Sequence, residues 1–88
     1  MMQRWDIYRA YVKQQDTNKV DHRPILIINV NPSDFICMKI TTNLSRKSPF
    51  EYHIKDWVGA GLDQPSCVRI KKKIKFKNFD NIVKLGTL

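Results

Sequence analysis

The chain has 88 residues, of which 16 are Lys or Arg and eight are Asp or Glu, so its formal net charge is +8. This length suits one small domain and excludes an enzyme that needs a cofactor domain beside a substrate domain. With 42% apolar and 27% charged residues, the composition is typical of a folded domain. The motifs GxGxxG, GxxxxGK[ST] and HExxH are absent from the sequence. We therefore treat residues 1–88 as one domain and expect no cofactor.

Two cysteines, Cys37 and Cys67, lie in apolar segments and are too few for a disulfide framework. Together with His22 and His53 they match no known spacing of metal ligands, so we expect no metal site. The N-terminal region has no apolar stretch like the core of a signal peptide. The longest aliphatic run, residues 25–28, is far shorter than the ~20 residues of a membrane helix. These features predict a cytoplasmic protein that does not enter a membrane.

Short runs of β-branched and aromatic residues recur along the chain, and turn residues separate them. In chain order they predict strands at residues 7–12, 24–30, 35–42, 50–55, 67–76 and 82–85. The run 24–30 is so densely apolar that we expect a central strand buried on both faces. The turn residues at 31–34 predict a hairpin between this strand and the next. Five or six short strands, with little helix, favour an all-β domain in the form of a small antiparallel barrel.

The segment 67–77 carries the largest concentration of positive charge. Because side chains alternate along a strand, its odd positions predict one cationic face, made of Arg69, Lys71, Lys73, Lys75 and Lys77. The even positions are apolar except for Lys72, which suggests a bulge that would split the basic stripe. The stripe suits a phosphate backbone or an acidic peptide, or it is a solvated face whose lysines protect an exposed edge. The loop 44–49 adds Arg46 and Lys47 as candidate contacts for an anionic partner.

The predicted hairpin brings chemically active side chains to its open end. Arg23 precedes Pro24, which we expect at the first position of its strand, where no ladder donor is needed. Antiparallel pairing would place Arg23 beside Thr41 and Thr42. A guanidinium binds two phosphate oxygens, hydroxyls donate to phosphate, and the imidazole of His22 is a candidate for proton transfer. The alternative is an ordinary polar strand entrance, with the threonines starting a turn.

The order of these motifs resembles the MazF/PemK family of bacterial toxin–antitoxin ribonucleases across almost the whole chain. The resemblance is carried by Trp5-Asp6-Ile7, His22-Arg23-Pro24 with the run 25–28, Ile40-Thr41-Thr42, the segment 61–69 and Leu85-Gly86-Thr87-Leu88. The chain departs from the family pattern at two places. Trp5 stands where the family has glycine, and Lys71-Lys72 stands where an acidic residue and a Gln are often found.

The resemblance implies an SH3-like β-barrel that forms a homodimer, cleaves single-stranded RNA without a metal and is neutralised by an acidic antitoxin protein. It assigns catalytic roles to Arg23 and Thr41, and we add His22 as a candidate for proton transfer. The candidate RNA-binding residues are Thr42, Arg46, Lys47, Ser66, Arg69, Lys71 and Lys73.

Three hypotheses follow. The first is a ribonuclease toxin that uses the 2′-hydroxyl of RNA as nucleophile and leaves a 2′,3′-cyclic phosphate and a 5′-hydroxyl. In it Arg23 stabilises the phosphorane charge and Thr41 holds a phosphate oxygen. The second is a non-catalytic basic β-barrel, a degenerate toxin that binds RNA or an acidic partner peptide, and the departures at Trp5 and Lys71-Lys72 motivate it. The third is DNA binding, which nothing in the sequence favours because no helix is predicted to enter a major groove.

Overall fold

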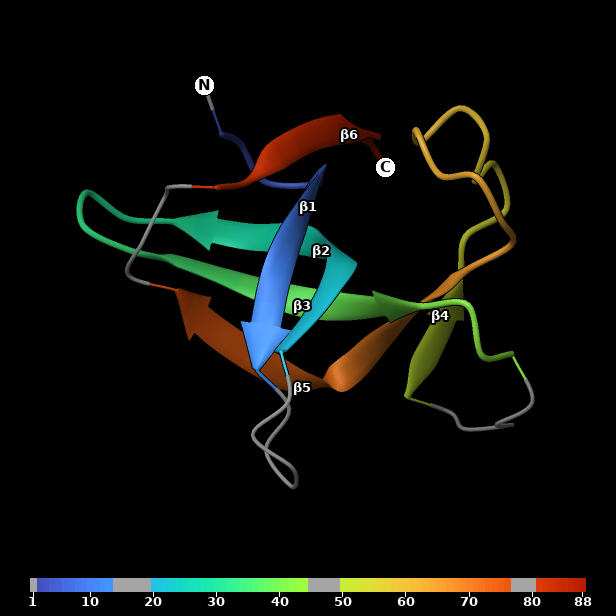
Figure 1. Ribbon diagram of the computed structural model, residues 1–88, viewed down its shortest axis with the longest axis horizontal. Helices are drawn as coiled ribbons and strands as arrows, with labels where there is room; N and C mark the ends of the chain where they lie inside the picture. The colour runs from blue at the N-terminus through green and yellow to red at the C-terminus, as the bar shows by residue number, and fades with distance from the viewer. Residues whose placement is uncertain (1, 14–19, 45–49, 77–80) are drawn as a thin grey trace.

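The computed structural model describes residues 2–13, 20–44, 50–76 and 81–88. These residues form six strands: β1 (Asp6–Lys13), β2 (Val20–Val30), β3 (Phe35–Thr41), β4 (Glu51–His53), β5 (Cys67–Phe76) and β6 (Val83–Thr87). All neighbouring strands pair antiparallel, in the order β4-β5-β3-β2-β1-β6 (Figure 1). The predicted all-β class is confirmed, with no helix in the described part of the chain. Because β4 and β6 lie at opposite ends of this order, the sheet is not closed into a complete barrel.

Each face of the sheet carries a hydrophobic core, and the central strands contribute to both. The first core contains Ile7, Leu26, Met38, Ile40, Ile54, Ala60, Leu62 and Val68. The second core contains Tyr8, Ala10, Val12, Ile25, Ile27, Phe35 and Cys37. In β2, Leu26 packs in the first core while Ile25 and Ile27 pack in the second, and none is more than 3% exposed. The predicted central strand, buried on both faces, is therefore confirmed.

The hairpin between β2 and β3 forms at the predicted turn. The backbone N–H of Asn31 donates to the carbonyl of Asp34 at 2.9 Å, and the Asn31 side-chain amide donates to the Asp34 carboxylate at 2.6 Å. The strands pair from Val30 opposite Phe35 to Ile25 opposite Lys39, with a shift in register between Ile27 and Asn29. Beyond Ile25 the two strands no longer pair, and a cavity lies between β2 and the end of β3.

The expected position of Pro24 at the start of its strand is wrong. β2 begins at Val20, and Pro24 lies inside it, opposite Arg9 of β1. Pairing between β2 and β3 starts only at Ile25, so residues 20–24 pair with β1 alone. Proline is tolerated there because this part of β2 is an edge on the β3 side, where no ladder donor is required.

The basic strand β5 forms as predicted, but a shift in its register divides its side chains between the two faces. Two residue steps on β3, from Met38 to Ile40, correspond to five steps on β5, from Lys73 back to Val68. Figure 1 shows β5 bending sharply in this region. The difference of three steps reverses the alternation, since Val68 packs in the first core whereas Ile74 and Phe76 pack on the second. The bulge suggested by Lys72 is confirmed, and the single continuous basic face does not form.

β4 is shorter than the strand predicted at residues 50–55. It ends at His53, although the backbone N–H of Ile54 still donates to the Ser66 carbonyl at 3.0 Å. The chain then turns, with the N–H of Leu62 donating to the Trp57 carbonyl at 2.9 Å. Of the alternating apolar residues Phe50, Tyr52 and Ile54, only Ile54 is buried, at 6% exposed. β4 pairs with the start of β5, with His53 opposite Cys67 and Glu51 opposite Arg69.

The two ends of the described chain meet where β6 pairs with β1. The last strand, predicted at 82–85, forms slightly later, at Val83–Thr87. Asp6 is buried there at 2% exposed. Its carboxylate accepts hydrogen bonds from the Gln3 backbone at 2.9 Å and the Thr87 hydroxyl at 3.1 Å, and it lies 3.5 Å from Lys84 Nζ. Burial raises the pKa of Asp6, but these hydrogen bonds and the Lys84 charge outweigh it, so the pKa lies below its ordinary value.

Trp5 adopts a backbone conformation that glycine would adopt more easily. Its φ of 74° lies in the left-handed region, where a side chain is strained. Two backbone hydrogen bonds hold it, from its N–H to Ile27 at 2.7 Å and from Leu88 to its carbonyl at 2.9 Å. These two hydrogen bonds stabilise a backbone conformation that would be less strained for glycine than for tryptophan.

Candidate functional site

A cavity of about 410 Å³ lies at the open end of the β2–β3 hairpin. Its lining comes from β1 and β2, from the end of β3, and from the segment that precedes β5. The lining residues are Arg9, Asp21, His22, Arg23, Pro24, Ile40, Thr41, Thr42, Leu62, Asp63, Gln64 and Ser66. The structure thus brings together five of the residues that the sequence analysis selected from separate motifs: His22, Arg23, Thr41, Thr42 and Ser66. Their chemical roles stay predictions.

Arg23 is held at the cavity by an ion pair within β2. Its Nη2 lies 2.8 Å from the Asp21 carboxylate, and the two side chains are 26% and 33% exposed. The Arg23 Nε is buried and has no hydrogen-bond partner among the described residues. A buried N–H donor without an acceptor destabilises a fold, and the Nε of Arg69 in β5, outside the cavity, is in the same state.

Arg9 is the cavity residue that the sequence analysis missed. It lies on β1 opposite Pro24, the residue next to Arg23, and its Nε is likewise buried without a partner in the described part of the chain. Two guanidinium groups therefore reach one cavity from neighbouring strands. The sequence pattern predicted the strand around Arg9 but carried no information on which residue of β2 it would oppose.

The hydroxyl groups of the cavity already have intramolecular contacts. Thr41 Oγ1 accepts a hydrogen bond from the Asn43 backbone N–H at 3.1 Å, which agrees with the expected turn and leaves its proton able to donate. Ser66 Oγ donates to the Gln64 carbonyl at 2.8 Å, and Ser66 is 4% exposed. Ser66 therefore stabilises the loop that enters β5, whereas Thr41 offers a donor to a ligand.

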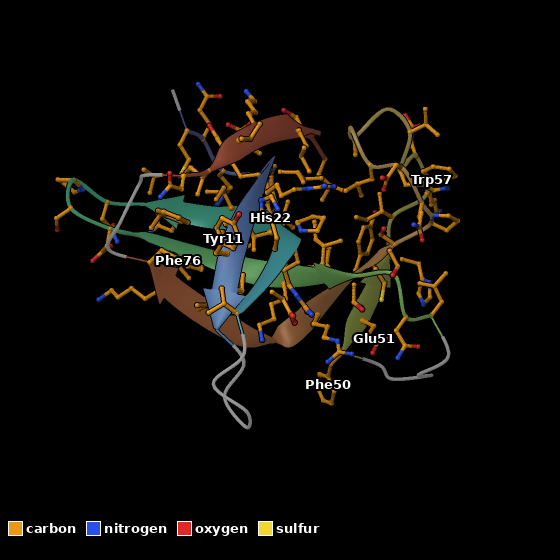
Figure 2. The ribbon with its side chains drawn as sticks, viewed as in Figure 1. Tyr11, His22, Phe50, Glu51, Trp57 and Phe76 are labelled. Atoms are coloured by element: carbon orange, nitrogen blue, oxygen red, sulfur yellow. The ribbon has the colours of Figure 1, made fainter. Side chains whose placement is uncertain are left out.

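His22 lines the same cavity while its ring rests on β1. The rings of Tyr11 and His22 are stacked, with centroids 4.4 Å apart and planes inclined by 14°. Figure 2 labels both rings on the part of the sheet where β1 and β2 pair. His22 and Arg23 lie opposite Tyr11 and Ala10, respectively, so their side chains leave opposite faces of β2. Both residues nevertheless line the same cavity, because it lies at the end of the sheet rather than on one of its faces.

Several predicted RNA-binding residues lie elsewhere or outside the described residues. Arg69 pairs across from Glu51 of β4 and does not line the cavity. Lys73 lines a separate apolar cavity of about 370 Å³ with Trp5, Tyr52 and other residues. Arg46 and Lys47 fall outside the described residues, as does the side chain of Lys71. The structure therefore concentrates the candidate chemistry on β1, β2 and the end of β3 rather than on the basic strand.

The cavity combines two arginines, threonine hydroxyls and a side-chain amide with two acidic residues, Asp21 and Asp63. Guanidinium and hydroxyl donors are suited to the oxygens of an anion such as a phosphate diester. Within the described ranges, no group of three or more His, Cys, Asp and Glu side chains is arranged to hold a metal ion. The described residues also include no helix long and apolar enough to cross a membrane.

In comparisons with known proteins, no protein family and no curated protein matches the sequence.

Proposed function

We propose that the protein is an endoribonuclease that cleaves single-stranded RNA and acts as the toxin of a type II toxin–antitoxin system. The observation that carries the proposal is the convergence of Arg9, Arg23 and Thr41 on one cavity. Guanidinium and hydroxyl groups donate hydrogen bonds to the non-bridging oxygens of a phosphate diester. RNA is favoured over other phosphates because its 2′-hydroxyl supplies the nucleophile, and the cavity needs only to bind and polarise the diester.

In the proposed reaction, the 2′-oxygen attacks phosphorus and the bond from phosphorus to the 5′-oxygen breaks. The 2′-hydroxyl loses a proton, for which His22 is the candidate acceptor, and the 5′-oxygen gains one as it leaves. Arg23, with Arg9 beside it, stabilises the second negative charge on the pentacoordinate phosphorus, and Thr41 donates to a non-bridging oxygen. The products are a 2′,3′-cyclic phosphate and a 5′-hydroxyl.

The test is cleavage of a long RNA in the presence of EDTA by the wild-type protein and by Arg23→Ala. Removal of one donor to the transition state lowers the rate by roughly 100- to 1,000-fold. Arg4→Ala is the matched control, because this substitution changes the net charge by the same amount. Arg4 lies outside the cavity, where its Nε donates to the Ile28 carbonyl. Cleavage by Arg23→Ala at the wild-type rate would overturn the assignment, provided that both variants melt as the wild-type protein does.

The Asp21–Arg23 ion pair specifically favours the second candidate, a non-catalytic module that binds RNA or an acidic peptide. At 2.8 Å the carboxylate occupies one end of the guanidinium, and a catalytic phosphate would have to compete with it. In the same experiment this module would retard RNA on a gel and leave it intact. Defined fragments with cyclic phosphate ends would exclude it.

The proposal includes the partners that the resemblance implies: single-stranded RNA, an acidic antitoxin protein and a second copy of the chain, in the cytoplasm. The net charge of +8 supports an acidic partner. Expression in a bacterial host tests the toxin, since growth arrest should occur with the wild-type protein and not with Arg23→Ala. Size-exclusion chromatography with light scattering tests the homodimer, which a monomeric mass at micromolar concentration would refute.

A further inference from the structure

The stacked side chains of Tyr11 and His22 are both exposed to solvent. Tyr11 is 56% exposed, while its neighbours Ala10 and Val12 on β1 are 1% and 2% exposed. His22 is exposed as well, and the two rings are nearly parallel, with centroids 4.4 Å apart. Two flat rings therefore stand together on the face of the β1–β2 pair opposite to Ala10 and Val12, which pack in the second core.

The stack adjoins the cavity that holds the two arginines. His22 lines this cavity and immediately precedes Arg23. Arg9 and Tyr11 are two residues apart on β1, so they project from the same face about 7 Å apart along the strand. This separation is comparable to that between a phosphate and its own base. A nucleotide whose phosphate occupies the cavity can therefore reach the rings with its base.

A cross-strand aromatic pair also stabilises a β-hairpin, and this role accounts for the contact between the two rings. It does not account for the exposure, because a pair that serves packing alone gains more when covered. The surroundings also disfavour an apolar protein partner, since the rings border a cavity lined by charged and hydroxyl groups. Single-strand nucleic-acid binders place exposed aromatic rings beside cationic groups, because every base has a face that can stack.

We propose that the Tyr11–His22 stack is a platform on which a base of single-stranded RNA lies, next to the phosphate bound by Arg9 and Arg23. This inference rests on the proposed RNA binding of the cavity and adds the recognition of a base to it. The base extends the existing stack by one ring. The platform binds any base and favours purines, whose larger rings cover more of the aromatic surface.

The test is binding of a 2′-O-methyl oligoadenosine, which cannot be cleaved through its 2′ position, and of the same oligonucleotide with abasic sites. Tyr11→Ala and Tyr11→Leu should weaken binding of the base-bearing oligonucleotide by roughly 5- to 150-fold. Tyr11→Phe should bind as the wild-type protein does, and binding of the abasic oligonucleotide should change little in any of them. Tyr52→Ala is the matched control, because Tyr52 is 46% exposed and lines the other cavity.

Equal affinities of Tyr11→Ala, Tyr11→Leu and the wild-type protein would overturn the platform, as would an equal loss with the abasic oligonucleotide. Thermal melting of each variant shows whether it is folded, and Tyr11→Leu retains the test if Tyr11→Ala unfolds the hairpin. The two proposals fail separately. Normal cleavage of RNA by Tyr11→Ala would refute the platform and leave the nuclease proposal intact. Base-dependent binding by a wild-type protein that does not cleave unmodified RNA would refute the nuclease and leave the platform intact.

Discussion

Gly61→Ala should destabilise the fold far more than its small change in volume suggests. Gly61 has φ of +88°, in the left-handed region, and a methyl group there would overlap the backbone carbonyl of Leu85. The contact is reciprocal, because a methyl group on Gly86 would meet the carbonyl of Ala60. The turn at 59–61 therefore packs backbone against backbone on β6, at a distance that only glycine allows.

The expected loss has two parts. A left-handed conformation costs alanine about 1–2 kcal/mol more than glycine, and overpacking against a rigid backbone costs about 1–3 kcal/mol. A combined loss of about 2–5 kcal/mol compares with a free energy of unfolding of about 4–13 kcal/mol for a chain of this length. For a small domain this corresponds to a fall in Tm of roughly 8–40 °C.

Thermal and urea unfolding followed by circular dichroism would measure the effect, with Gly59→Ala as the control. A methyl group on Gly59 meets only the carboxylate of Asp56, an exposed side chain that can move away. That control should lose less than about 1 kcal/mol, mainly through the hydrogen bond from the Gly59 N–H to Asp56 at 3.0 Å. If Gly61→Ala and Gly59→Ala unfold at the same midpoint, the close packing of this turn on β6 is refuted.

Two further predictions concern titrating groups. Because the pKa of Asp6 is lower in the folded state than in the unfolded state, its contribution to stability is present above the unfolded pKa, about 3.9, and is lost as the pH falls through the folded value. Urea unfolding between pH 6 and pH 2 should therefore show a smaller loss of stability for Asp6→Asn than for the wild-type protein, and equal slopes would contradict this. Burial raises the pKa of the Cys37 thiol to about 12, so in a Cys67→Ala background it should react with Ellman's reagent at pH 8 only after unfolding in urea. Immediate reaction of the folded protein would show that Cys37 is accessible.

The fold class and the β2–β3 hairpin were predictable because both depend on local chemistry. Dense β-branched residues at 25–28 can be covered only in a central strand, and the side chains of Asn31 and Asp34 close the turn themselves. The hairpin then brings Arg23 and Thr41 to the same open end, where both line the cavity.

The rest of the candidate site depends on pairing between segments that are distant in sequence. Arg9 enters the cavity only because β1 aligns it with Pro24, and Tyr11 stacks on His22 through the same register. Alternation within β1 shows which residues share a face but not which residues of β2 they oppose. The strand at 50–55 was predicted, but its early end at His53 was not, because the turn that follows is held by contacts such as that between the Leu62 N–H and the Trp57 carbonyl.

Because the basic side chains of β5 are divided between the two faces of the sheet, the charge of this strand is weaker support for an anionic partner than one continuous basic face would be. Lys73 lies opposite Met38, on the first-core side, whereas Arg69 follows the reversed alternation to the other side. Charges separated in this way repel one another weakly, because salt screens exposed charges beyond about 8 Å at physiological ionic strength. The strand can therefore carry its charge without an anionic partner. The Nε atoms of Arg9, Arg23 and Arg69 are all buried without an acceptor among the described residues, but only Arg9 and Arg23 line the cavity beside the threonine hydroxyls. The case for a phosphate ligand accordingly rests on these two arginines, and it predicts a binding affinity that depends on their guanidinium groups more strongly than on the number of lysines in β5.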